Sequence, residues 1–128
     1  MINNNKILHQ IFISVNGSKI QDYPIYIEGQ KKWIKWCKKH KYKYNYITKS
    51  TIEKYYINDP TVRDFYYNLK YDWQRIDFAK YLIINKDGGV YIDLDIHPNL
   101  SNKNKINLAQ LFEYNEYIIG VWYDKKKE

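Results

Sequence analysis

The stretch GGVYIDLDIHP, residues 88–98, decides how the fold of this chain is interpreted. Its apolar side chains recur at every second position from Val90, which is the period of a β-strand that buries one face. Asp93 and Asp95 interrupt the apolar pattern, although carboxylates are almost never fully buried without a partner. We predict a strand over residues 90–95 that carries both acids on one face, since side chains two residues apart point the same way.

Two acids this close repel each other unless a positive group lies between them. A hard divalent cation meets that need, because Mg²⁺ and Mn²⁺ prefer oxygen ligands and often take only one or two protein carboxylates. Ligands of open α/β sheets also bind at the carboxyl ends of strands. The pattern therefore favours a metal site at Asp93 and Asp95, although the polar exit of an edge strand also fits D-x-D. His97 is a weaker candidate for a third ligand, because Pro98 is expected to end the strand.

Upstream of this strand, residues 72–86 are expected to form a helix with Asp72 as its N-cap. Asp77 and Lys80 are one turn apart on the same side of that helix, a spacing at which side chains interact. Gly88 is expected to end the helix, because glycine adopts the left-handed conformation without steric cost. The apolar side of the helix is predicted to comprise Trp73, Ile76, Ala79, Tyr81, Leu82 and Ile83.

The rest of the chain alternates between strand and helix patterns. Trp33, Trp36 and Cys37 fall on one face of an amphipathic helix, and Cys37 is the only cysteine, so no internal disulfide forms. The alternation predicts an α/β fold with a mainly parallel sheet, in a single domain over residues 1–128. The expected elements are a strand over residues 6–13, a helix over 24–40, a strand over 42–46, helices from Ser50 and after Thr61, a helix over 107–112 and a strand over 117–123.

The chain of 128 residues carries a formal charge of +7 and contains 45% hydrophobic residues, which favours one folded domain over disorder. No apolar run approaches the length of a membrane span, and residues 1–6 lack the apolar core of a signal peptide, so we expect a soluble, cytoplasmic protein. The positive charge suits an anionic partner, and residues 38–44 interleave basic and aromatic side chains as a nucleic-acid surface does. A solvated helix end explains that segment more simply, so nucleic acid is not the expected partner.

Two segments resemble a known family. RIDFAKY, residues 75–81, and GGVYIDLD, residues 88–95, resemble the DXD sugar-binding region of glycosyltransferase family 32. That family includes initiating α-1,6-mannosyltransferases and is related to the glucosyltransferase domains of large clostridial toxins. The opening KILHQIFI, residues 6–13, is similar to the family's first strand, and the resemblance continues in order to about residue 100.

The resemblance implies a GT-A fold, a UDP- or GDP-linked sugar donor and Mn²⁺ or Mg²⁺ as the cofactor. By position, Asp95 corresponds to the direct metal ligand, and Asp93 to the residue shared between the metal's shell and hydroxyls of the ribose or sugar. Asp77 matches the acid that holds hydroxyls of the donor sugar. Lys80 stands where the family usually has arginine, which keeps the positive charge but loses the planar fork of donors. These four residues form the expected catalytic site.

Two residues of the first predicted strand, Ile11 and His9, are expected to belong to the donor-binding site. His9 is predicted to be a buried, hydrogen-bonded residue that lines the nucleotide pocket rather than a base.

The expected function is metal-dependent transfer of a sugar from a nucleotide donor to a glycan or protein acceptor, with the retention of configuration that the resemblance implies. About thirty residues follow Asp95, whereas catalytic domains of the family usually continue further. One alternative is therefore a catalytically weak GT-A relic that binds nucleotide sugar or glycan, and another is a site completed by homo-oligomerisation. A basic nucleic-acid-binding protein is a remote alternative. A phosphatase with an aspartyl nucleophile ranks last, because its chemistry usually has Thr or Val where His97 stands.

Overall fold

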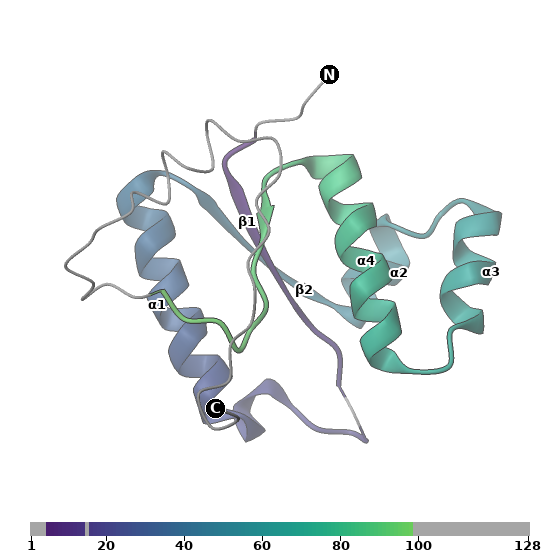
Figure 1. The fold of residues 1–128 in the computed structure, drawn as a ribbon, viewed down its shortest axis with the longest axis horizontal. Helices are drawn as coiled ribbons and strands as arrows, with labels where there is room; N and C mark the ends of the chain where they lie inside the picture. Colours follow the sequence, from purple (N-terminus) through teal and green to yellow (C-terminus); the bar gives the residue numbers. More distant parts are fainter. Residues whose placement is uncertain (1–4, 15, 99–128) are drawn as a thin grey trace, which may run out of the picture.

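The computed structural model describes residues 5–14 and 16–98 of the chain. It has the mixed α/β architecture that the sequence predicts, with helices packed around a small parallel sheet (Figure 1). In chain order the elements are β1 (Ile7–Phe12), the 3-10 helix η1 (Ile20–Asp22), α1 (Pro24–His40), β2 (Lys43–Thr48), α2 (Lys49–Tyr55), α3 (Pro60–Asn68), α4 (Asp72–Asp87) and β3 (Val90–Tyr91). The helix and strand predicted over residues 107–112 and 117–123 lie outside the described residues.

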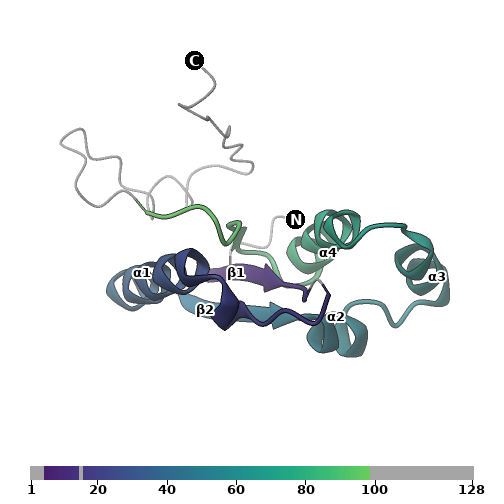
Figure 2. The same ribbon diagram turned by 90° about the horizontal axis from the view of Figure 1, so that it is seen from below.

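The sheet has the strand order β2-β1-β3, and both neighbours run parallel to β1. Since β1 lies between two partners, its backbone is paired on both edges, and its four middle residues are buried. In Figures 1 and 2, α1 lies on one side of the strands, whereas α2, α3 and α4 lie on the other. Parallel strands need crossover connections that place helices on the sheet faces, which explains this arrangement.

A separate hydrophobic core fills the space on each side of the sheet. On the side of α1, the buried residues are Leu8, Trp33, Trp36, Cys37 and Tyr42. On the opposite side they are Ile11, Ile13, Ile47, Ile52, Ile57, Tyr66, Ala79 and Ile83. The predicted burial of the Trp33, Trp36 and Cys37 face is confirmed. Burial of these large apolar side chains is the main force that holds the helices on the sheet.

Three of the predicted helix starts differ from the structure. The helix expected after Thr61 begins at Pro60, as α3, because the Asp59 side chain accepts the backbone N–H of Thr61 at 2.9 Å. The helix expected from Ser50 begins earlier, as α2, because the backbone N–H of Thr48 donates to Thr51 Oγ1 at 3.4 Å. Asp72 is the first residue of α4 rather than its N-cap, and the side-chain Oε1 of Gln74 accepts the backbone N–H groups of Lys70 and Tyr71, each at 3.1 Å. In α2 and α4, the side chain at the third helical position accepts from a backbone N–H just before the helix, as in a capping box.

The apolar side predicted for α4 was partly wrong. Ala79 and Ile83 are fully buried, as expected, whereas Trp73 and Tyr81 are 62% and 75% exposed. The stripe of α4 that contacts the core comprises the buried Ala79 and Ile83 and the partly buried Ile76, Phe78 and Leu82. The exposed aromatic side chains lie outside that stripe.

The strand predicted over residues 90–95 was wrong in its extent. β3 ends at Tyr91, although the N–H of Ile92 still donates to His9 O at 3.1 Å. The N–H of Ile96 then donates to Asp93 O at 3.1 Å, which closes a turn that contains both acids. We call residues 93–96 the DXD turn. The alternating apolar pattern continues into this turn because Leu94 is buried there without belonging to a strand.

Candidate active site

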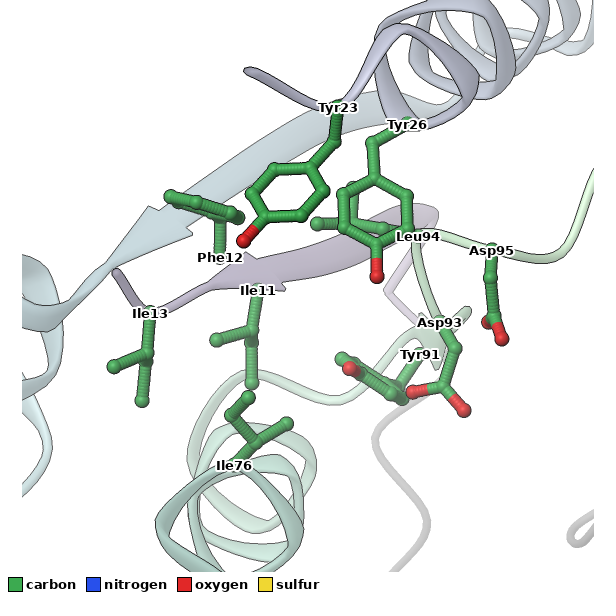
Figure 3. A pocket seen from close by; sticks show the side chains of 10 residues that line it. All are labelled: Ile11, Phe12, Ile13, Tyr23, Tyr26, Ile76, Tyr91, Asp93, Leu94 and Asp95. Atoms are coloured by element: carbon green, nitrogen blue, oxygen red, sulfur yellow. The ribbon is translucent and has the colours of Figure 1, made fainter. Parts of the chain in front are cut away.

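A pocket of about 290 Å³ opens at the carboxyl end of β1, beside the DXD turn (Figure 3). This is the edge at which open α/β sheets bind ligands. Its residues come from β1, the start of α1, α4 and the segment after β3. They are Ile11, Phe12, Ile13, Tyr23, Tyr26, Ile76, Tyr91, Asp93, Leu94 and Asp95.

Asp93 and Asp95 both line this pocket, and Figure 3 shows their side chains at the same end of it. Both are open to solvent, since the Asp93 side chain is 48% exposed and Asp95 is exposed. The buried Leu94 between them anchors the turn to the protein. Both carboxylates therefore line the same end of the pocket, and a turn places them there rather than the alternation of a strand.

Lys80 connects α4 to the DXD turn. Its Nζ lies 2.9 Å from Asp77 Oδ1 and 3.9 Å from Asp93 Oδ1, so the predicted pairing of Asp77 with Lys80 is confirmed. The same ammonium lies 5.1 Å from the ring centroid of Tyr91, within the range of a cation–π contact. The structure thus groups Asp77, Lys80 and Asp93 at the pocket's edge.

Tyr91 separates these charges from the core. Burial, followed by the negative charges of Asp93, Asp77 and Asp95, raises the pKa of its phenol above the ordinary value. Tyr91 is therefore a neutral group at physiological pH, and its ring faces the Lys80 ammonium. Burial is the main cause of the raised pKa, and the three carboxylates add to it.

Two side chains that the sequence analysis did not single out for the site hold the DXD turn in place. The fully buried Gln10 donates through Nε2 to Asp93 O at 3.4 Å, and its Oε1 accepts from the Tyr44 hydroxyl at 2.7 Å. Trp33 Nε1–H donates to Ile96 O at 2.8 Å. A polar residue in the middle of an apolar strand was the available signal for Gln10, because buried amides need partners.

His97 contacts α1. Its Nε2 lies 2.9 Å from Ile25 O, to which it donates, and its ring packs so closely against Gly29 that a Cβ there would lie 2.5 Å from it. Within the described residues, His, Cys, Asp and Glu side chains nowhere form a group of three that could hold a metal ion. The weaker expectation of a third ligand at His97 is therefore wrong.

His9 is fully buried and hydrogen-bonded, as predicted, but it is not among the residues that line this pocket. Its Nε2 lies 2.8 Å from Gly88 O and its Nδ1 lies 3.0 Å from Asn45 Nδ2. Because a carbonyl only accepts, Nε2 carries the proton and Nδ1 accepts from the amide. The expected contact of His9 with the donor is therefore corrected to a positioning role at the Gly88–Gly89 turn, whereas Ile11 does line the pocket.

The burial of His9 makes the stability of the fold depend on pH. Desolvation lowers the pKa of His9 below its ordinary 6.5, so the unfolded chain binds this proton more tightly than the native state does. The resulting stability is present above pH 6.5 and is lost as the pH falls. Between pH 8 and 5, the free energy of unfolding measured with urea should fall less steeply with decreasing pH in His9→Gln than in the wild type. The two slopes should differ by up to about 1.4 kcal/mol per pH unit. Identical slopes in the two proteins would contradict this assignment.

The chemistry of Asp93 and Asp95 fits a hard divalent cation. Two exposed carboxylates supply oxygen ligands, and Mg²⁺ and Mn²⁺ commonly complete their shells with water and substrate phosphates. The neighbouring pocket has room for a ligand that would bring such phosphates.

No helix within residues 5–14 and 16–98 has the length and apolarity that a membrane crossing requires.

The fold and this site define an α/β protein with a pocket at the carboxyl end of its parallel sheet and two acids at one end of that pocket. The family model described as "Glycosyltransferase sugar-binding region containing DXD motif" matches residues 12–113, which is most of the chain. The chain therefore belongs to this glycosyltransferase family, whose members use nucleotide sugars. Comparison with the curated proteins and with the solved structures gave no significant match.

Proposed function

We propose that this chain transfers a sugar from a UDP- or GDP-linked donor to an acceptor hydroxyl, in the manner of glycosyltransferase family 32. Asp93 and Asp95 would hold Mn²⁺ or Mg²⁺, and Asp77 would bind hydroxyls of the donor sugar. The proposal rests on the pocket beside the DXD turn. Both carboxylates of that turn line one end of the pocket, and the pair of Asp77 and Lys80 lies beside them.

The other side of the pocket suits the nucleoside of such a donor. The rings of Tyr23 and Tyr26 are stacked with centroids 5.0 Å apart, and the ring of Phe12 lies 5.9 Å from that of Tyr23. Burial, together with the charges of Asp95 and Asp93, raises the pKa of Tyr26, so its phenol stays neutral. Aromatic rings offer a base a stacking surface, and a diphosphate attached to that base would reach toward the acids.

In the reaction, the oxygen of the acceptor hydroxyl bonds to C1 of the donor sugar, and the bond from C1 to the diphosphate oxygen breaks. The nucleoside diphosphate leaves with the electron pair, and the acceptor proton passes to solvent. A bound divalent cation stabilises the negative charge that develops on the leaving group. The Lys80 ammonium adds positive charge at the same place, and Asp77 fixes the sugar by accepting from its hydroxyls.

The Lys80 side chain is expected to contribute through its charge. Lys80→Arg should preserve or raise the transfer rate, because it keeps the charge and restores the fork of donors that the resembling family usually has. Lys80→Ala should lower the rate by about 100-fold, since it removes a positive group from the leaving phosphates. Both rates are measured as release of nucleoside diphosphate. A large loss in Lys80→Arg would show instead that lysine is specifically required.

The proposed function is tested by incubating the chain with UDP- and GDP-sugars and Mn²⁺, with and without chelator. We expect one donor to release its nucleoside diphosphate only while the metal is present. Metal-dependent binding without any release would instead favour the competing function, a domain that binds nucleotide sugars without efficient transfer. The observation that favours that competitor is the lysine at position 80 in place of arginine. NMR of the product's anomeric proton tests the retention of configuration that the resemblance implies.

A further inference from the structure

Exposed aromatic side chains line one face of α4 next to the proposed donor site. Trp73 and Tyr81 have the two largest exposed fractions, 62% and 75%, of the large hydrophobic side chains in the described residues. Single exposed apolar residues need no explanation, but aromatic residues gathered on one face mark an interaction site.

The spacing places these residues in one line. Trp73, Asp77 and Tyr81 follow at intervals of four residues, so they share one face of the helix over about 12 Å. We call these three residues the aromatic face. Tyr71 extends it at the N-terminus of α4, because its ring is stacked on Trp73 with a centroid distance of 6.0 Å and an interplanar angle of 11°.

The aromatic face is continuous with the proposed donor site. Its central carboxylate, Asp77, pairs with Lys80 Nζ at 2.9 Å, and the same Nζ lies 3.9 Å from Asp93 Oδ1 of the DXD turn. Ile76, the neighbour of Asp77 in the sequence, lines the pocket itself. A chain-like ligand lying along α4 would therefore pass the reacting sugar at the middle of the aromatic face.

The composition of the aromatic face favours one kind of ligand. The Asp77 side chain is 56% exposed between two aromatic residues, whereas the centres of protein interfaces are depleted of charged residues. A carboxylate in the middle would also be repelled by an anionic membrane surface. A sugar chain suits both the aromatic rings and the carboxylate. Each sugar ring has an apolar C–H face that packs on an aromatic ring and hydroxyls that donate to a carboxylate.

We infer that the aromatic face binds the acceptor, and that the acceptor is a glycan chain whose rings stack on Trp73 and Tyr81. The inference rests on the proposed function and names the substrate class of its second substrate. Asp77, between the two stacking rings, contacts the donor sugar and the acceptor sugar that lies over it, and Tyr71 supports the ring of Trp73.

The test is transfer to the methyl glycosides and linear trisaccharides of glucose, galactose, mannose and N-acetylglucosamine, with the chain, the donor and Mn²⁺. Trp73→Ala and Tyr81→Ala should each raise the acceptor KM by about tenfold, while the donor-induced rise in Tm stays as in the wild type. Tyr55→Ala is the matched control, because it removes another exposed tyrosine, which is 49% exposed on α2 and lies outside the aromatic face. It should leave both quantities unchanged.

The outcomes separate this inference from the proposed function. If no donor binds to the wild type with Mn²⁺, the proposed function fails. If a donor binds but Trp73→Ala and Tyr81→Ala leave the acceptor KM unchanged, the inference fails alone. It is also overturned if the wild type binds donor but neither glycosylates nor binds any of these saccharides. Loss of a dimer, or of binding to lipid vesicles, in Trp73→Ala would assign the aromatic face to another partner and overturn it as well.

Discussion

Replacing Asp95 by alanine will abolish metal-dependent binding of the nucleotide sugar and leave the fold intact. Asp95 is exposed at the end of the pocket, so its removal costs little packing. Two carboxylates of the DXD turn would bind the proposed ion. Losing one of them should weaken donor binding in the presence of Mn²⁺ by more than about 100-fold. This loss exceeds that expected for a residue that only supports a metal ligand. Isothermal titration calorimetry with the donor measures this loss directly.

The matched control for this variant is Asp64→Ala, which removes an equally exposed acid from α3. It should bind donor and metal as the wild type does, because it changes the net charge by the same amount at a distance from the pocket. Circular dichroism and urea unfolding should give the same stability for both variants. Unchanged donor affinity in Asp95→Ala would remove the assignment of the metal site.

The second large effect is on stability, and it concerns Gly89. Its φ of +84° is unfavourable for any residue with a side chain, and a Cβ there would lie 2.3 Å from the backbone oxygen of Ile7 in β1. Neither the added Cβ nor the Ile7 oxygen lies at the end of a flexible side chain. The strands β1 and β3 would therefore have to move apart to relieve the clash. We expect Gly89→Ala to lower the free energy of unfolding by more than about 3 kcal/mol, measured with urea.

Gly17 supplies the control for backbone strain alone. Its φ is +75°, but a Cβ added there would meet no atom within 4 Å. Gly17→Ala should therefore cost only about 1–2 kcal/mol, the price of the left-handed conformation. The difference between the two variants isolates the close approach of the Gly88–Gly89 turn to β1. Equal losses in the two variants would contradict that explanation.

The helices were predictable where the local signals and the tertiary packing agree. The bounds of α1 match the predicted helix over residues 24–40, because Pro24 suits the first helical position and the amphipathic pattern ends where Lys41 adopts a φ of +61°. The start of α3 was predicted too late, after Thr61, although Asp59 accepts from the N–H of Thr61 at 2.9 Å and Pro60 occupies the first helical position. These signals act within a few residues and can be identified from sequence.

The errors arose where one pattern fits two structures. The alternation of Val90, Ile92 and Leu94 fits a strand, but Leu94 is buried in a turn, and within residues 5–14 and 16–98 no strand pairing continues beyond Ile92. Trp73 and Tyr81 have the spacing of a buried helical face, but the core contacts another side of α4, on which Ala79 and Ile83 are buried. Which apolar residues find a core depends on the tertiary arrangement and not on their spacing.

The candidate site was predictable in its charges and not in its supports. The sequence motif identified Asp93 and Asp95, and the helical spacing identified the pair of Asp77 and Lys80. The hydrogen bonds that hold the DXD turn join Gln10 to Asp93 and Trp33 to Ile96, and they connect segments far apart in the chain. Such contacts follow from the packing of α1 and β1 around the turn, and apart from the polar Gln10 within an apolar strand they leave no local sequence signal.

The central claim is that Asp93 and Asp95 bind a divalent cation together with a nucleotide-sugar donor. The most direct test measures the melting temperature of the chain with UDP- and GDP-linked sugars, each with and without Mn²⁺. A ligand that binds only the folded state raises the melting temperature by mass action. We predict a rise for one donor that appears only with Mn²⁺ and disappears in Asp95→Ala. No rise with any donor in the presence of Mn²⁺ would contradict the account.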